Sequence, residues 1–167
     1  MKRILKYILL FIISFLFQVL IFDKAYFYGY FNVYVYILFI LLLPVDLNKN
    51  IVLLLGFLLG ITVDVFNSTL GIHAAATVFM TYFRPSILRG FSPHDGYELN
   101  KNLGIINYGF KWFFKYAISL ILLHHTFLII LDTWSFYNFG HTFIKIVFSV
   151  FASLLFIIMG HLLIMKK

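Results

Sequence analysis

The sequence has no cysteine among its 167 residues, and only 11% of them are charged. Without cysteine there are no disulfides, no thiolate metal ligands and no thiol nucleophile. A soluble domain carries about 25% charged residues, so this chain has too few to solvate the surface of a globular protein. Hydrophobic residues make up 63% instead, and much of the surface therefore requires lipid as its solvent.

Sequence motifs of the common catalytic sites are also missing. The chain has no Gly-x-Ser-x-Gly, no His-Glu-x-x-His and no phosphate-binding glycine loop. Its six acidic residues are scattered along the chain rather than paired. The sequence therefore predicts a protein that is not an enzyme and that uses no cofactor or metal.

Long apolar stretches predict six transmembrane helices, because a membrane-spanning helix needs roughly 20 apolar residues. We expect an all-α integral membrane protein, a compact six-helix bundle that forms a single domain over 1–167. In size and helix count it is similar to the substrate-binding components of vitamin importers. The predicted spans are 4–22, 30–45, 51–66, 72–88, 108–131 and 142–165.

The spans at 51–66 and 72–88 are short, and a turn signal from Asn67 to Gly71 separates them. Two interpretations fit this pair. Each helix crosses the membrane with Lys49 or Arg84 reaching toward the interface, or the two form a re-entrant hairpin that leaves four true spans.

The distribution of Lys and Arg is consistent with six spans, and a re-entrant hairpin at 51–88 would leave this distribution unchanged. With both termini inside, inner segments hold eleven of the 13 basic residues, and only Lys24 and Lys145 lie outside. This is the asymmetry that the positive-inside rule predicts for cytoplasmic loops. The formal net charge of +7 is thus explained by membrane orientation, and no nucleic-acid partner is expected.

The most informative stretch contains Gly56, Gly60 and Asp64, which are spaced four residues apart. Positions at this spacing lie along one stripe of a helix. Glycines on such a stripe let another helix approach closely, and Asp64 at its end would then face protein rather than lipid. We expect Gly56, Gly60, Asp64, Gly71 and His73 to form a helix-packing or partner surface.

Asp64 is an ionisable residue near membrane depth, where such residues are paired or functional. The favoured interpretation is structural: Asp64 caps the turn and accepts hydrogen bonds from backbone amides around 67–69, or pairs with a histidine. A proton-relay or ligand role and a role in holding a partner subunit remain alternatives. The adjacent His124 and His125 are interpreted as packing residues rather than metal ligands.

Basic side chains cluster around the predicted inner loop between the fourth and fifth spans. Anionic lipid headgroups are their natural counter-charges, and an acidic cytoplasmic partner is the alternative. The residues predicted to contact headgroups are Arg84, Arg89, Lys111 and Lys115.

The pattern Gly56-x-x-x-Gly60-x-x-x-Asp64, followed by Leu70-Gly71-Ile72-His73-Ala74 and then Arg84, resembles the bacterial rod shape-determining protein MreD family. The resemblance covers about residues 51–89. It implies a small multi-pass protein of the bacterial inner (cytoplasmic) membrane that is part of the cell-elongation machinery. It also implies a non-catalytic scaffold, which controls cell shape and lateral peptidoglycan synthesis.

The partners that this resemblance implies are an MreC-like bitopic membrane protein and, indirectly, MreB filaments, RodA and a class B penicillin-binding protein. A different class of function fits the size and helix count equally well: a small-molecule-binding subunit of a membrane transporter. Such a protein needs a polar pocket, and Asp64, Asn67, His73 and His124 are the side chains available to line one.

Overall fold

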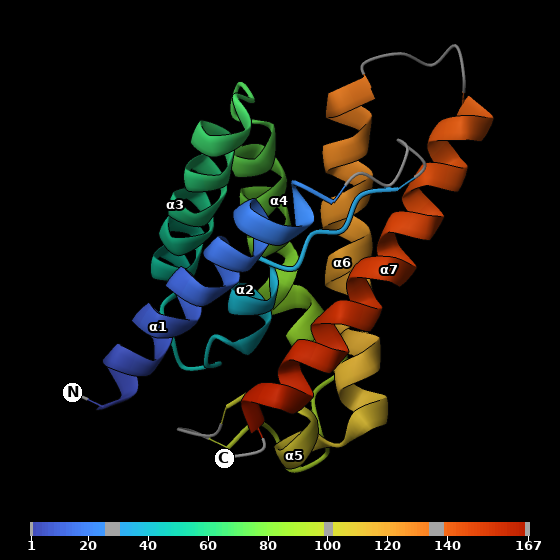
Figure 1. The fold of residues 1–167 in the computed structure, drawn as a ribbon. Helices are drawn as coiled ribbons and strands as arrows, with labels where there is room; N and C mark the ends of the chain where they lie inside the picture. Colours follow the sequence, from blue (N-terminus) through green and yellow to red (C-terminus); the bar gives the residue numbers. More distant parts are fainter. Residues whose placement is uncertain (1, 26–30, 99–101, 134–138, 166–167) are drawn as a thin grey trace.

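The computed structural model describes residues 2–25, 31–98, 102–133 and 139–165, and every regular element in these ranges is a helix (Figure 1). The first helix continues into a π-helical turn, and the second and fifth helices are short. In chain order the elements are α1 (Lys2–Phe17), η1 (Gln18–Phe22), α2 (Leu38–Leu42), α3 (Lys49–Asn67), α4 (Ile72–Gly90), α5 (Ile105–Tyr108), α6 (Phe110–Thr133) and α7 (Phe139–Met165).

Four helical stretches are long and apolar enough to cross a membrane: Ile4–Phe22, Lys49–Asn67, Phe110–Thr133 and Gly140–Ile164. Their outer faces carry large apolar side chains that no other part of the described chain covers, such as Ile8 and Ile12 of α1 or Phe148 and Phe151 of α7. Contiguous exposed apolar surface on this scale is typical of lipid contact. The chain thus has the helices of an integral membrane protein.

Helices α3 and α4 form an antiparallel hairpin, and each has 19 residues, or about 28 Å at 1.5 Å per residue. The turn between them places Ser68 at φ +55° and Gly71 at φ +84°, where a glycine carries no steric penalty. From this hairpin, α4 packs along α6 and α6 along α7, while α1 contacts α2 and α3 (Figure 1).

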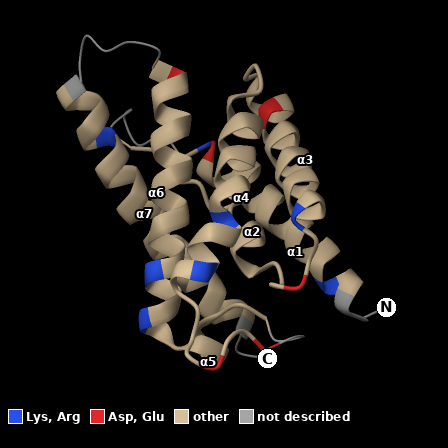
Figure 2. Ribbon diagram, turned by 180° about the vertical axis from the view of Figure 1, so that it is seen from behind, with Lys and Arg blue, Asp and Glu red and all other residues tan. Residues whose placement is uncertain are grey.

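Lys and Arg gather mainly at one end of the bundle, called the basic end below, while Asp and Glu occur at both ends (Figure 2). At the basic end α3 begins, α4 ends and α6 begins, and these termini carry Lys49, Arg89, Lys111 and Lys115. At the opposite, hairpin end, α3 finishes near Asp64 and α6 near Asp132. Three basic residues of the predicted inner set, Lys101, Lys166 and Lys167, lie outside the described residues.

The second predicted span, 30–45, differs from the structure. Residue 30 lies outside the described residues, 31–35 form no helix and only Leu38–Leu42 is α-helical, so the prediction of a continuous helix here is wrong. Every residue from 33 to 43 is nevertheless at most 8% exposed. Residues 31–43, called the inserted segment below, therefore run through the protein interior rather than against lipid.

Candidate functional site

The inserted segment has buried backbone N–H and C=O groups, and most of them are not paired within a helix. A backbone without helical hydrogen bonds must find other partners at membrane depth, because no water is available there to satisfy it. Each unpaired buried peptide group costs about 1–3 kcal/mol. Polar side chains from η1, α4, α6 and α7 supply these partners, and together they form a polar interior around the segment.

One edge of the inserted segment is satisfied by Gln18, the first residue of η1, which is fully buried. Its carboxamide nitrogen donates to the Val33 carbonyl over 3.0 Å, and its carboxamide oxygen accepts from the Val35 amide over 2.8 Å. A glutamine side chain presents the same donor and acceptor as a peptide group. Gln18 thus pairs with the segment as a neighbouring strand would.

The opposite edge is satisfied by α7. The amide of Asn32 donates to the Ser149 hydroxyl over 2.9 Å, and the amide of Tyr34 donates to the Ser153 hydroxyl over 2.8 Å. In an extended chain the backbone N–H and C=O groups of successive residues point to opposite edges. The backbone groups of residues 32 and 34 therefore face α7, while those of 33 and 35 face Gln18. Two serines four residues apart lie on one helix face and match this spacing.

The end of the inserted segment is satisfied by Arg84 of α4 and Tyr116 of α6. The Arg84 Nη2 donates to the Leu43 carbonyl, and its Nε donates to the Tyr116 hydroxyl over 2.9 Å. That hydroxyl donates in turn to the Leu41 carbonyl over 3.2 Å. Carbonyls at the end of a helix have no intrahelical partner, so Arg84 and Tyr116 cap α2.

This geometry corrects the prediction that Arg84 is a surface contact for lipid headgroups. Its side chain is only 3% exposed, because α2 ends inside the protein and leaves carbonyls that the guanidinium satisfies. Arg89, Lys111 and Lys115 are exposed at the basic end, and their contact with headgroups stays a prediction.

The middle of the segment meets a cluster of histidines. The Tyr36 hydroxyl lies 3.1 Å from Nδ1 of His73 and 2.7 Å from Nε2 of His124. The Tyr34 ring packs edge-on against the rings of His73, His124 and His125, with centroid distances of 5.4, 5.8 and 5.1 Å. These side chains join α4 and α6 across the segment.

The hydrogen bonds of His125 assign its tautomer. Its Nδ1 lies 2.9 Å from the Ile121 carbonyl, which can only accept, so Nδ1 carries the proton. Its Nε2 then accepts from the Ser153 hydroxyl over 2.8 Å. His124 and His125 are thus packing and hydrogen-bonding residues, and no group of three His, Cys, Asp or Glu side chains is placed to hold a metal ion within the described chain.

Asp64 caps the N-terminus of α4 from the neighbouring helix. Its Oδ1 accepts from the His73 amide over 3.0 Å and from the Thr69 hydroxyl, and its Oδ2 accepts from the Ala74 amide over 2.8 Å. A carboxylate at this position also interacts favourably with the helix dipole. The predicted capping role is therefore observed, but the capped amides are those of residues 73 and 74 rather than 67–69.

The glycine stripe of α3 faces α4 of the same chain. A Cβ added to Gly60 would lie 2.5 Å from the Ala74 Cα and 2.7 Å from the His73 carbonyl oxygen, and one added to Gly56 would lie 2.8 Å from the Thr81 Cγ2. Two helices approach this closely only where small residues meet. Gly56, Gly60 and Asp64 are buried in this contact, so they are not available to a partner protein.

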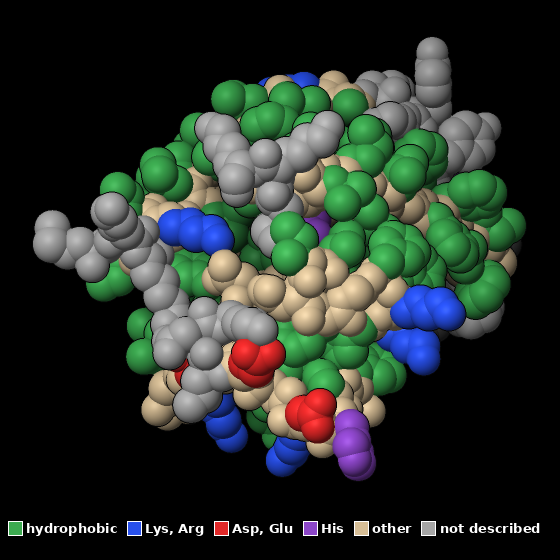
Figure 3. All heavy atoms as spheres, turned by 90° about the horizontal axis from the view of Figure 1, so that it is seen from below, with side chains coloured by type: hydrophobic (Ala, Val, Ile, Leu, Met, Phe, Trp, Pro, Cys, Tyr) green, Lys and Arg blue, Asp and Glu red, His purple; other side chains and the backbone are tan. Residues whose placement is uncertain are grey.

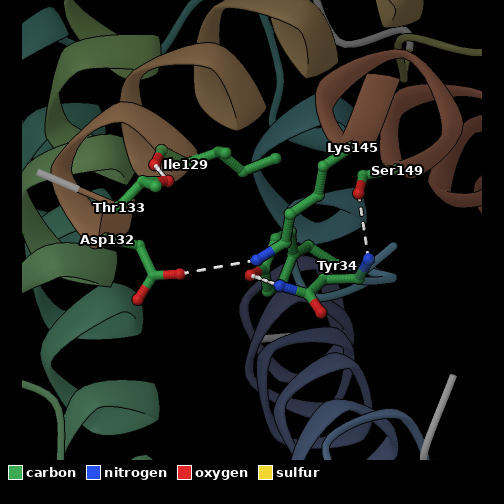
Figure 4. A network of polar contacts seen from close by, with 7 residues as sticks. Tyr34, Ile129, Asp132, Thr133, Lys145 and Ser149 are labelled. Carbon is green, nitrogen blue, oxygen red and sulfur yellow. Dashed lines mark hydrogen bonds and ion pairs between the residues drawn. The ribbon is translucent and has the colours of Figure 1, made fainter. Parts of the chain in front are cut away.

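At the hairpin end, α6 and α7 are joined by an ion pair (Figure 4). The Lys145 Nζ lies 3.6 Å from Asp132 Oδ2. Beside it the Asn32 side chain donates to the Tyr34 hydroxyl over 2.9 Å. The bond from the Asn32 amide to Ser149 of α7 and the ring contacts of Tyr34 with His124 and His125 of α6 place the start of the inserted segment between α6 and α7.

The sequence interpretation missed Gln18, Tyr36, Tyr116, Ser149 and Ser153. The available signal was weak, since each is a single polar residue within an apolar stretch. Such a residue indicates a buried partner but does not identify it. Comparisons with protein-family models, curated proteins and solved structures found no match for this chain, and the polar interior is therefore the basis for inferring a function.

Replacing Gln18 with leucine is expected to release the start of the inserted segment, because it orphans the Val33 carbonyl and the Val35 amide at about 1–3 kcal/mol each. The chain has no cysteine, so a single Val33→Cys substitution provides a unique probe at a position that is 2% exposed. Maleimide should label this cysteine slowly when Gln18 is present and several-fold faster in the Gln18→Leu background.

A matched control is Thr62→Val, since the described hydrogen bond of the Thr62 hydroxyl goes to the Leu58 carbonyl of its own helix. It should leave labelling at position 33 unchanged. Equal labelling rates with and without Gln18 would show that the carboxamide does not hold the segment.

Proposed function

We propose that this protein is a non-catalytic scaffold subunit of the bacterial cell-elongation complex. In this role it associates with an MreC-like bitopic membrane protein and, through it, with MreB filaments, RodA and a class B penicillin-binding protein. It would thereby help to control cell shape and lateral peptidoglycan synthesis. The observation that carries the proposal is the α3–α4 hairpin, in which Gly60, Asp64 and Gly71 of the MreD-like pattern shape the helix contact and the turn.

Within that hairpin, Gly60 sets the closest helix contact, Asp64 caps α4 and Gly71 adopts the left-handed turn. The polar side chains of the interior likewise bond to the chain's own backbone, as Gln18 and Arg84 do. Side chains that bond to the chain's own backbone stabilise one arrangement of the helices. A scaffold subunit requires such a stable arrangement, with apolar faces toward the membrane.

The proposed arrangement is a multi-pass protein of the bacterial inner membrane, with six passes and both termini in the cytoplasm. Supporting it, α4 packs against α3, and the inserted segment extends from Ser149 of α7 to Arg84 near the end of α4. The exposed Lys and Arg of the basic end would face the cytoplasm, as the positive-inside rule expects.

The transporter alternative requires a polar pocket, and the side chains that would line it already have partners. Asn67 donates to Asp23 over 2.9 Å, Asp64 is bound to the α4 amides, and both His73 and His124 contact Tyr36. The inserted segment occupies the space between them. Within the described residues, the one buried polar atom of these four side chains that has no hydrogen-bond partner is Nδ1 of His124.

The proposal is tested by co-purification. A tagged copy of this protein, extracted in mild detergent from bacteria that also express an MreC-like protein, should recover that partner well above the level obtained with an unrelated multi-pass protein bearing the same tag. Depletion in a rod-shaped host should widen the cells. Failure to recover the partner, together with normal cell width after depletion, would refute the proposed function.

A further inference from the structure

The basic end of the bundle contains a pocket of about 240 Å³ between the start of α3, the end of α4 and the loop that follows α4. Three of its lining side chains are cationic: Lys49, Arg84 and Arg89. No acidic residue is among the residues that line it. The nearest acids in the sequence, Asp46 and Glu98, each have an interaction of their own.

Arg84 is the buried cation among these three side chains, and it makes the electrostatic potential of the pocket more positive. Its described hydrogen bonds go to the Leu43 carbonyl and the Tyr116 hydroxyl, and both of these groups are neutral. A buried guanidinium is costly unless an opposite charge compensates it. The positive charge of Arg84 thus stays uncompensated by its protein partners, at the wall of a pocket that Lys49 and Arg89 flank.

Tyr97 forms another wall of the pocket and adds no negative charge. Its hydroxyl donates to the Leu88 carbonyl over 2.7 Å, and burial raises the pKa of Tyr97 to about 12. The phenol is therefore neutral at physiological pH. Val45, Leu47, Val52, Pro85 and Leu88 complete the lining, so the pocket joins an apolar floor to a cationic rim.

We propose that this pocket binds the phosphate group of an anionic ligand, with Lys49 and Arg89 as the direct contacts and Arg84 supplying positive potential from the wall. Lysine and arginine are the side chains that bind phosphate oxygens through charge-assisted hydrogen bonds. The pocket lies at one end of the candidate span Lys49–Asn67, and the ends of a membrane-spanning helix lie near the lipid headgroups. Figure 3 shows the face seen from below, which carries Lys and Arg side chains together with apolar, Asp and Glu side chains.

The shared chemistry is a phosphate anion, and it has two sources: the headgroup of an anionic phospholipid, or a soluble phosphate. This site is independent of the proposed scaffold role. It also differs from the diffuse attraction of lipids to exposed cations, because a pocket predicts one preferred site rather than a general affinity. Lys111 and Lys115, which are exposed on α6 and do not line the pocket, provide the matched comparison.

The test uses the full-length protein in neutral detergent and native mass spectrometry with phosphatidylglycerol or phosphatidylcholine. We expect one phosphatidylglycerol to bind preferentially, and binding to weaken roughly tenfold, or about 1.4 kcal/mol, in a Lys49→Gln/Arg89→Gln variant. Both side chains are exposed, so this variant should keep the unfolding temperature of the parent protein without lipid. A Lys111→Gln/Lys115→Gln variant should bind like the parent.

A second arm adds inorganic phosphate at millimolar concentration. Phosphate that displaces the lipid, or that stabilises the parent but not the pocket variant, would identify a soluble ligand, whereas an effect of lipid alone would identify a headgroup. Either result supports the pocket. The proposal is overturned if neither probe distinguishes the parent from the pocket variant, or if the Lys111/Lys115 variant loses binding equally.

Discussion

Replacing Gly60 with alanine is expected to lower the free energy of unfolding by about 3 kcal/mol, the upper part of the range for overpacking. The added Cβ would lie 2.5 Å from the Ala74 Cα and 2.7 Å from the Ala74 nitrogen. Both atoms are backbone, so no side-chain rotation can relieve the contact. Helix α4 would have to move away from α3, and the bonds from Asp64 to the start of α4 would lengthen.

Two other glycines provide controls for this substitution. At Gly56 the added Cβ meets the side chain of Thr81 rather than backbone, so Gly56→Ala should cost less. At Gly140 nothing lies within 4 Å, and alanine there should change stability little, because this glycine is the second residue of α7 and the cost of glycine applies to helix interiors.

Thermal or denaturant unfolding of the purified protein in detergent measures all three variants. The expected order of stability is Gly140→Ala, then Gly56→Ala, then Gly60→Ala. A Gly60→Ala protein as stable as its parent would mean that the close contact between α3 and α4 does not contribute to the fold.

The hairpin that carries Gly60 is also the part of the fold that the sequence predicted best. The expected helices 51–66 and 72–88 became α3 (Lys49–Asn67) and α4 (Ile72–Gly90), because the turn signal around Gly71 is local and unambiguous. Helices α6 and α7 likewise lie within three residues of the expected 108–131 and 142–165. Apolar length and local breakers are sufficient to locate such elements.

The same reasoning failed for 30–45, because an apolar run has no period that separates a buried helix from a buried extended segment. Val33, Val35 and Ile37 are β-branched and alternate with Tyr34 and Tyr36, a composition enriched in strands. That pattern was the available signal. It was outweighed by the expectation that a membrane-spanning segment is helical.

The partners of the polar interior were beyond sequence reasoning for a different reason. Arg84 bonds to a carbonyl 41 residues away, and Ser153 accepts from an amide 119 residues away. The acceptor at Leu43 exists only because α2 ends inside the protein. Because the extended conformation of the inserted segment was not predicted, the side chains that bond to its backbone, including Arg84, could not be assigned their roles.

Asp64→Ala is expected to have the other large effect, lowering the free energy of unfolding by an amount on the order of 4 kcal/mol. The substitution leaves two buried amides, those of His73 and Ala74, without an acceptor and removes the partner of the Thr69 hydroxyl. Asp64→Asn keeps one acceptor oxygen, so it should recover about half of the loss. Thr69→Val removes only the hydroxyl and should cost about 1 kcal/mol.

The comparison of stability with function separates the capping role of Asp64 from a proton-relay role. If Asp64 only caps α4, partner recovery and cell width should follow the stability of each variant, and Asp64→Asn should be intermediate in both. If its ionisation is needed, Asp64→Asn should abolish function although its stability stays intermediate between those of the parent protein and Asp64→Ala. That second outcome would contradict the capping account, because an asparagine at this position still accepts a hydrogen bond from an α4 amide.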